Sequence, residues 1–259
     1  MRKQNADNAY FTDLWANIRQ HISRNEVADL ATETLSEMEV VTRGKRAAVA
    51  WSGGKDSLAL YHLAQALGIT AGVLGLCHLE YPQLERWYRQ NTPTDVQTIR
   101  TPQDLAFLRD NPEMLFPETS ALLSRWYQIK QIRAQEIYCE REGVEVLLVG
   151  RRREEGNYIG PGPNGTHQKR GSQTVIYCPL RDWTHAQVLG LLHYSEIGLP
   201  PNYYWPHGFT IGSGSWPVNN FAKMGLNGWQ YVYERNPSVV IEAASVLPSA
   251  QAFLRSLGV

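Results

Sequence analysis

The sequence predicts an α/β fold, a three-layer sandwich built on a mostly parallel, five-stranded sheet. Short apolar runs alternate along the chain with stretches of helical periodicity, which is the pattern of parallel strands joined by helices. The run Arg46 to Trp51 also passes through a Ser-Gly-Gly turn directly into a helical pattern. A chain of 259 residues is long enough for one such domain with additions at its ends.

An N-terminal helical extension, residues 1–45, comes first. Apolar residues recur there at helical spacing, at Phe11, Leu14 and Ile18 and again from Val27 to Met38, and predict two amphipathic helices. The core, residues 46–200, has predicted strands at 46–51, 71–79, 96–100, 144–149 and 175–178. Its predicted helices are 56–67, 84–91, 120–142 and one that starts at residue 185.

The last section, residues 201–259, is irregular and rich in aromatic residues, and we expect it to pack on the core with a terminal helix at 239–257. Its aromatic side chains, Tyr203, Phe209, Trp216 and Trp229 among them, either stack on a ligand or form a second small core or a dimer surface. The Gly- and Pro-rich segment 156–172 is long for a connection, which indicates a binding loop or lid.

Composition excludes several classes of protein. The formal net charge is zero, so no global field draws the chain to nucleic acid or to an anionic membrane, although a local basic groove stays open. The three cysteines, Cys77, Cys139 and Cys178, form no CxxC pair, which argues against a disulfide framework, a zinc site or an iron-sulfur cluster. The N-terminus lacks a signal-peptide pattern and no run of about 18 apolar residues occurs, so we expect a cytoplasmic protein.

The strand-to-helix loop Ser52-Gly53-Gly54-Lys55-Asp56-Ser57 carries the predicted chemistry. Its two glycines allow a tight turn that points amide groups at an anion, and the following helix presents its positive N-terminal end to the same place. The Lys55 ammonium adds positive charge, the serine hydroxyls can donate to phosphate oxygens, and Asp56 can cap the helix or hold Mg²⁺. The spacing differs from the Walker A pattern GxxxxGK[ST].

This loop resembles the signature of the PP-loop ATP pyrophosphatases, the adenine-nucleotide alpha-hydrolase superfamily, whose fold is Rossmann-like. Three later segments narrow the resemblance to the branch that contains the phosphoadenosine phosphosulfate (PAPS) reductases. Gly150 to Glu155 is similar to that branch's GxRxxES segment, although the final serine is absent, and Cys178 to Thr184 is similar to its PL-x-W-T stretch. Leu199 to Tyr203, with His207 to Phe209, resembles its P-x-N-x-L-Y-x-x-G segment.

Three consecutive arginines follow the fourth strand, where ligands of open α/β sheets bind. If the extended backbone continues, the side chains of Arg151 and Arg153 point one way and that of Arg152 points the other. Arg151 and Arg153 are the predicted catalytic residues, and Gly150 and Arg152 are predicted to bind the nucleotide. The alternative is a solvated basic turn paired with Glu154 and Glu155.

Other polar residues are weaker candidates for the site. His78, with Glu80, stands at the end of the second strand and is a further candidate for the nucleotide site, although such a pair is more often structural. Lys130 and Arg133 share a helical face and could support the same anion or merely the surface.

The resemblance implies that ATP and Mg²⁺ are bound and that an acceptor attacks the α-phosphorus, with Lys55, Asp56, Arg151 and Arg153 as catalytic residues. The acceptor is open: a nucleic acid, or a substrate served by a sulfur donor protein. A PAPS reductase would need a nucleophilic cysteine in its C-terminal tail, and the tail after Cys178 has none. That reductase and a nucleotide-binding subunit without turnover stay as alternatives, and a homo-oligomer stays open.

Overall fold

The computed structural model describes residues 7–212, 214–218, 221 and 224–258. The chain forms two compact units, each assembled from segments that are far apart in sequence. The first contains residues up to 74, 91–98 and 135–213, and the second contains 75–90, 99–134 and 214–259. The predicted sections 1–45, 46–200 and 201–259 are continuous in sequence, and that division stays a prediction.

The sheet confirms the predicted α/β class, with one correction. Its strand order is β3-β2-β1-β4-β6-β5, so it has six strands where five were predicted. β1, β2, β4 and β6 pair in parallel, whereas β5 is antiparallel to β6 and has only two residues. The strands are β1 (Ala47–Ala50), β2 (Gly72–Leu76), β3 (Val96–Arg100), β4 (Val146–Leu148), β5 (His167–Gln168) and β6 (Val175–Tyr177). β5 was not predicted, because a strand of two residues inside a Gly- and Pro-rich segment is too short to show alternation of apolar and polar residues.

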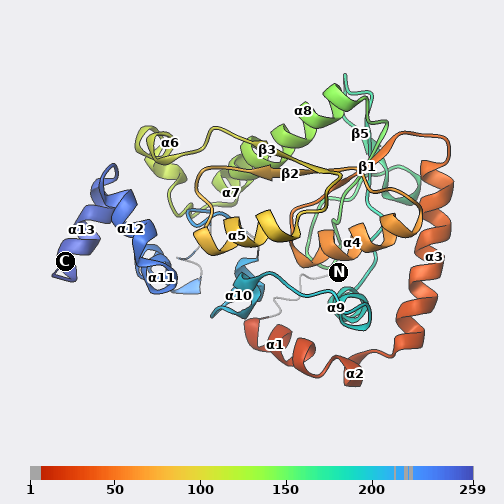
Figure 1. The fold of residues 1–259 in the computed structure, drawn as a ribbon, viewed down its shortest axis with the longest axis horizontal. Helices are drawn as coiled ribbons and strands as arrows, with labels where there is room; N and C mark the ends of the chain where they lie inside the picture. Colours follow the sequence, from red (N-terminus) through yellow and green to blue (C-terminus); the bar gives the residue numbers. More distant parts are fainter. Residues whose placement is uncertain (1–6, 213, 219–220, 222–223, 259) are drawn as a thin grey trace. The chain divides into compact units, whose positions relative to one another are not determined.

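Helices cover both faces of this sheet. α4 and α9 pack against each other on one side of β1, and α8 lies on the other side (Figure 1). This is the arrangement that right-handed crossovers produce when the strand order reverses. Helices lying wholly in the first unit are α1 (Asn8–Ala16), α2 (Ile18–His21), α3 (Arg24–Thr42), α4 (Lys55–Ala66), α9 (His185–Tyr194), α10 (Gly208–Ile211) and the short η3 (Pro163–Gly165) and η4 (Pro201–Tyr204). α5 (Pro82–Asn91) and α8 (Arg133–Glu142) contribute residues to both units.

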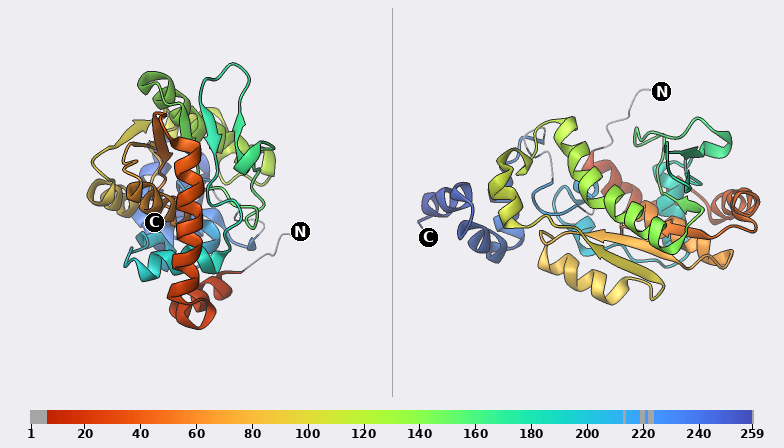
Figure 2. Two further views of the ribbon diagram at one scale, coloured as in Figure 1. Left: turned by 90° about the vertical axis from the view of Figure 1, so that its right-hand side faces the viewer. Right: turned by 90° about the horizontal axis from the view of Figure 1, so that it is seen from above.

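The N-terminal helices are held by the core of the first unit. α3 is a single long helix (Figure 2) that starts at a capping box of Ser23 and Glu26. Its buried Met38 and the α1 residues Phe11 and Leu14 have exposed fractions of 6% or less. Two amphipathic helices were predicted here and the structure has three, because α1 ends at Ala16 and Ile18 begins the separate α2. α1 and α3 both contact α9.

The second unit holds an aromatic core, which confirms packing for Trp216 and Trp229. Both rings lie against Phe116, with centroids 6.3 and 5.0 Å away. The helices lying wholly in this unit are α6 (Leu105–Asp110), η1 (Pro112–Met114), α7 (Ser120–Tyr127), η2 (Gln128–Ile132), α11 (Gly228–Arg235), α12 (Pro237–Ala244) and α13 (Pro248–Ser256). The single terminal helix predicted at 239–257 is wrong, because Pro248 cannot continue a helix and instead begins α13.

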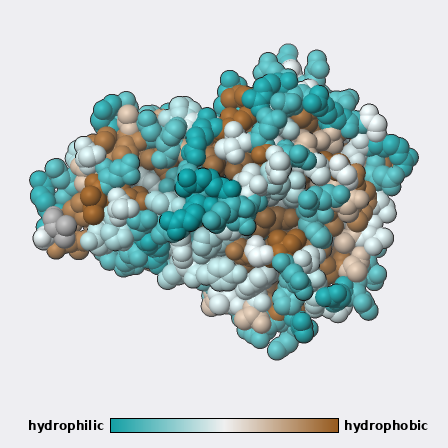
Figure 3. Space-filling view, viewed as in Figure 1, coloured by the Kyte–Doolittle hydropathy of each residue, from teal (hydrophilic) through white to brown (hydrophobic). Residues whose placement is uncertain are grey.

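Hydrophilic side chains cover most of the face seen in Figure 1, and apolar ones form separate groups (Figure 3). The large apolar side chains left exposed, such as Val40, Tyr158 and Ile241, belong to different elements, as is usual on a folded protein. None of the described helices has the length and apolarity needed to cross a membrane.

Candidate functional site

The candidate site lies at the carboxyl ends of β1 and β4, within the first unit. These strands are neighbours, and the chain proceeds from β1 toward one edge of the sheet and from β4 toward the other. Loops that leave two such strands diverge, which opens a crevice where ligands of α/β sheets bind. The loop 52–57 leaves β1 and the segment 149–155 leaves β4, so the predicted motifs meet here.

The loop 52–57 is fastened by its own serines. The Ser57 hydroxyl accepts a hydrogen bond from the Ser52 amide at 3.1 Å and donates one to the Gly54 carbonyl at 2.9 Å. Gly53 has φ +71°, a conformation that favours glycine, and Gly54 is the N-cap of α4 with no side chain to offer. The Ser57 hydroxyl, which was predicted to donate to phosphate, holds the turn in this structure.

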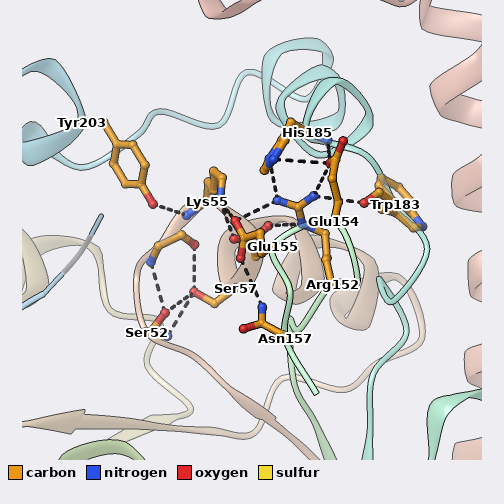
Figure 4. A network of polar contacts seen from close by, with 12 residues as sticks. Ser52, Lys55, Ser57, Arg152, Glu154, Glu155, Asn157, Trp183, His185 and Tyr203 are labelled. Atoms are coloured by element: carbon orange, nitrogen blue, oxygen red, sulfur yellow. Dashed lines mark hydrogen bonds and ion pairs between the residues drawn. The ribbon is translucent and has the colours of Figure 1, made fainter. Parts of the chain in front are cut away.

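The cations of Lys55 and Arg152 meet the carboxylates of Asp56, Glu154 and Glu155 beside the loop, and Figure 4 shows this network. Lys55 Nζ lies 2.7 Å from Asp56 Oδ2 and 2.5 Å from Glu155 Oε1. The Arg152 guanidinium donates to Asp56 at 2.6 Å, to Glu154 at 3.0 Å and to Glu155 at 2.9 Å. Arg152 is fully buried, and the Trp183 carbonyl, 3.0 Å away, accepts a further hydrogen bond from it, so the buried charge is stabilised by several partners.

The pKa shifts follow from this pairing. Burial disfavours the charged form of Lys55, but Asp56 and Glu155 outweigh it and raise the pKa of Lys55. Burial likewise acts against the Asp56 carboxylate, and the charges of Lys55 and Arg152 outweigh it and lower the pKa of Asp56. Lys55, Asp56 and Arg152 are therefore all charged at neutral pH, because the Asp56 carboxylate and the two cations stabilise each other's charges.

His185 completes the network in its neutral form. Its Nδ1 lies 2.9 Å from Arg152 Nη2, and because a guanidinium can only donate, Nδ1 accepts and Nε2 carries the proton. Nε2 is 3.5 Å from Glu154, which also accepts from the His185 amide at the start of α9. Burial, with the charges of Arg152 and Lys55, lowers the pKa of His185 to about 3. The residue is thus a neutral acceptor that orients Arg152.

Of the three arginines, Arg152 is the one that points into the network. Arg153 is 52% exposed at its side chain and pairs with Asp182, away from the network, while Arg151 is half-buried. Gly150 permits the close approach of the two loops, since a Cβ there would lie 3.1 Å from the Asp56 backbone. The catalytic roles of Arg151 and Arg153 stay predictions.

Sequence reasoning missed His185 and Tyr203 as members of the site, and it considered Glu154 and Glu155 only as partners of the arginines in the alternative of a solvated turn. The Tyr203 hydroxyl accepts a hydrogen bond at 3.0 Å from the Lys55 amide, 148 residues away. Tyr203 belongs to the segment 199–203 used for the family resemblance, and His185 directly follows the segment 178–184; this was the available signal.

A second buried polar network lies inside the second unit. Lys130, in the π-helical turn η2, donates to Glu80 and, at 2.7 Å, to Ser215, and Cys77 Sγ is 3.2 Å from the Ser215 hydroxyl. Lys130 is thus paired and buried, whereas Arg133 is exposed, so the two do not act together as an anion site. His78 also belongs to this unit, where its side chain is exposed, and its role at the nucleotide stays a prediction.

Asp56 does not fit a metal ligand in this arrangement. Both of its carboxylate oxygens are engaged by the cations of Lys55 and Arg152. Over the described part of the chain, no cluster of three or more His, Cys, Asp or Glu side chains has the arrangement of a metal site. The Mg²⁺ site at Asp56 stays a prediction.

The sequence profile of the phosphoadenosine phosphosulfate reductase domain matches residues 46–212. The chain belongs to this family. Membership places it in the PP-loop superfamily of nucleotide-binding proteins, in a family of enzymes, as the resemblance implied. The matched range contains every residue of the site.

Solved structures similar to this chain include a PAPS reductase from Candida auris in a phosphate complex, with 13% identity, 76% of this chain and 90% of that chain covered, and a TM-score of 0.45. An FMN adenylyltransferase from Candida glabrata has 15% identity over 74% of this chain and 65% of its own, with a TM-score of 0.45. The yeast FAD synthetase in complex with FAD has 14% identity, with 75% of this chain and 70% of that chain covered, and a TM-score of 0.44. No curated protein matches the chain.

Proposed function

We propose that this protein is an ATP pyrophosphatase of the PP-loop type, which cleaves ATP between the α and β phosphates and adenylates an acceptor. The observation that carries the proposal is the convergence of Lys55 and Arg152 at the N-terminal end of α4, at the reversal point of the sheet. Two fixed cations and a helix N-terminus together are suited to a polyphosphate.

The chemistry follows from where these charges lie. An acceptor oxygen attacks the α-phosphorus, the bond to the bridging oxygen breaks, pyrophosphate leaves, and the acceptor's proton is released to solvent. Lys55 would stabilise the charge that develops on the leaving pyrophosphate by direct contact, and the buried Arg152 would act through its positive charge while it holds Asp56 and Glu155. Catalysis would then consist mainly of positioning and charge neutralisation. For this, Lys55 must exchange Glu155 for a phosphate oxygen, and Glu155 is the most exposed of the three carboxylates, at 28%.

The acceptor and the physiological partner belong to the same proposal. An adenylated oxygen is a good leaving group, so sulfur or nitrogen insertion into the acceptor is one net outcome. We keep a nucleic acid and a substrate served by a sulfur donor protein as the two classes of acceptor. ATP is the leading nucleotide, and PAPS is its competitor.

The reductase alternative is disfavoured by the state of the three thiols. Cys77, Cys139 and Cys178 are all buried. Burial raises the pKa of Cys77 to about 12 and that of Cys139 to about 11, and it raises the pKa of Cys178 as well. A nucleophilic cysteine needs a lowered pKa and access to substrate, so none of the three fits that role.

Calorimetric titration of the full chain with ATP plus Mg²⁺, and separately with PAPS, tests the proposal. We expect ATP to bind and Lys55→Ala to weaken binding by at least tenfold, because a charged contact to phosphate contributes about 1.5–3 kcal/mol. Lys169→Ala is the matched control, since Lys169 pairs with Glu136 at an exposed position of the same unit.

The possible outcomes separate the alternatives. Binding of PAPS alone would favour the sulfonucleotide branch, and binding of neither nucleotide would contradict the proposal. A chain that binds ATP but releases no pyrophosphate with any acceptor would be the non-catalytic subunit.

A further inference from the structure

The N-terminal end of α4 is completed by a side chain from the C-terminal part of the first unit. The N-cap Gly54 supplies no side-chain oxygen, and the amide of the first helical residue, Lys55, donates to the Tyr203 hydroxyl at 3.0 Å (Figure 4). Tyr203 is 5% exposed. The Tyr203 side chain is therefore a buried structural partner of the loop 52–57 and not a surface group.

The Tyr203 hydroxyl has a donor function that the protein does not use. A phenolic oxygen can accept one hydrogen bond and donate another. The accepted bond comes from Lys55, and among the described residues no acceptor for the Tyr203 proton lies within hydrogen-bonding distance. Burial raises the pKa of Tyr203, so the proton is retained at neutral pH. A buried donor without an acceptor costs free energy unless a ligand or water receives it.

An aromatic row fixes the ring of Tyr203. Its centroid is 5.1 Å from that of Phe209, which stacks on Phe11 at 5.6 Å, and Phe11 meets the His185 ring at 4.6 Å. The Phe209 amide donates to Asn8 at 2.9 Å. Phe11 of α1 thus contacts His185, which lies beside Arg152, and connects through Phe209 to Tyr203, which lies beside Lys55. These contacts hold the Tyr203 ring with its hydroxyl at the start of α4.

We propose that Tyr203 is a nucleotide-binding residue whose hydroxyl donates to a phosphate oxygen of the bound nucleotide while it holds the Lys55 amide in place. This inference rests on the proposed function and deepens it, because it assigns to the C-terminal segment a direct contact with the phosphate chain. The phosphate lies where Lys55 Nζ, the α4 amides and the phenolic proton converge. A neutral donor there adds affinity without adding to the charge of the site.

Titration of the full chain carrying Tyr203→Phe tests the inference, with ATP plus Mg²⁺, inorganic tripolyphosphate and adenosine as probes. We expect ATP and tripolyphosphate to bind about 10- to 100-fold more weakly than to wild type, the loss for a hydrogen bond to a charged group, and adenosine to bind unchanged. Phenylalanine keeps the ring and its contact with Phe209. Tyr61→Phe is the matched control, because Tyr61 is also buried, lies in α4 and donates to the Thr70 carbonyl at 2.9 Å; its affinities should stay within twofold.

The outcomes distinguish this inference from the proposed function. Wild-type ATP binding together with unchanged binding by Tyr203→Phe overturns the inference and leaves the function standing. An equal loss for ATP and adenosine also overturns it, because that pattern indicates general disruption. Failure of wild type to bind any nucleotide overturns both. Should Tyr203→Phe fail to fold, Tyr203→His, which restores a ring donor, must bind tripolyphosphate more tightly than Tyr203→Leu for the inference to survive.

Discussion

Replacing Glu155 with glutamine removes the negative charge that pairs with the Lys55 ammonium group. The amide keeps the shape and the accepting oxygen of the carboxylate, so Lys55 and Arg152 retain a partner at 2.5 and 2.9 Å, but the negative charge that competes with phosphate is lost. A hydrogen bond to a charged group contributes about 1.5–3 kcal/mol, and we take the lower end because Glu155 is 28% exposed and solvent screens it. About 1.4 kcal/mol corresponds to a tenfold change, so Glu155→Gln should bind ATP about tenfold more tightly than wild type.

The assay is calorimetric titration with ATP plus Mg²⁺ at two salt concentrations, and the gain should shrink at the higher one. Glu154→Gln is the matched control. Glu154 also pairs with Arg152 but does not contact Lys55, and it accepts from the His185 amide. We expect this neighbour to change ATP affinity by less than threefold. Weaker or unchanged binding by Glu155→Gln would refute the idea that Glu155 stands in for a phosphate.

Two further predictions concern stability. Folding lowers the pKa of His185 from 6.5 to about 3. Below pH 6.5 the imidazole is therefore protonated in the unfolded chain but stays neutral in the folded chain. The free energy of unfolding should therefore fall as pH drops from 6.5 to 4, by up to about 1.4 kcal/mol per pH unit from this residue, and urea unfolding of His185→Asn should show a flatter profile; an identical slope would contradict the neutral assignment. Lys130→Met leaves the Glu80 carboxylate buried without its cation and should cost about 3–5 kcal/mol of stability by urea unfolding. The double variant Lys130→Met, Glu80→Gln should recover much of that loss, and a single variant as stable as wild type would show that the pair is not needed.

The sequence by itself determined the place of the site and most of the sheet. A buried strand, two glycines and an immediate helix are local features, and local spacing alone orients the amides of residues 52–57. The strand predicted at 96–100 matches β3 residue for residue, and α4 begins within one residue of its prediction. The second strand ends at Leu76, three residues early, because the chain turns at Cys77 to Leu79 and the Cys77 amide donates to the Glu80 side chain at 3.3 Å.

The tertiary structure decided which side chains meet at the loop. Alternation places Arg152 opposite its neighbours, but only the packing of β4 beside β1 shows that Arg152 is the residue that faces the loop. Tyr203 reaches Lys55 across 148 residues, and the aromatic row that fixes it needs α1 from the other end of the chain. Such contacts depend on how elements pack, which no local pattern encodes. The sequence therefore predicts the loop at which a phosphate would bind, whereas the fold determines which side chains surround that loop.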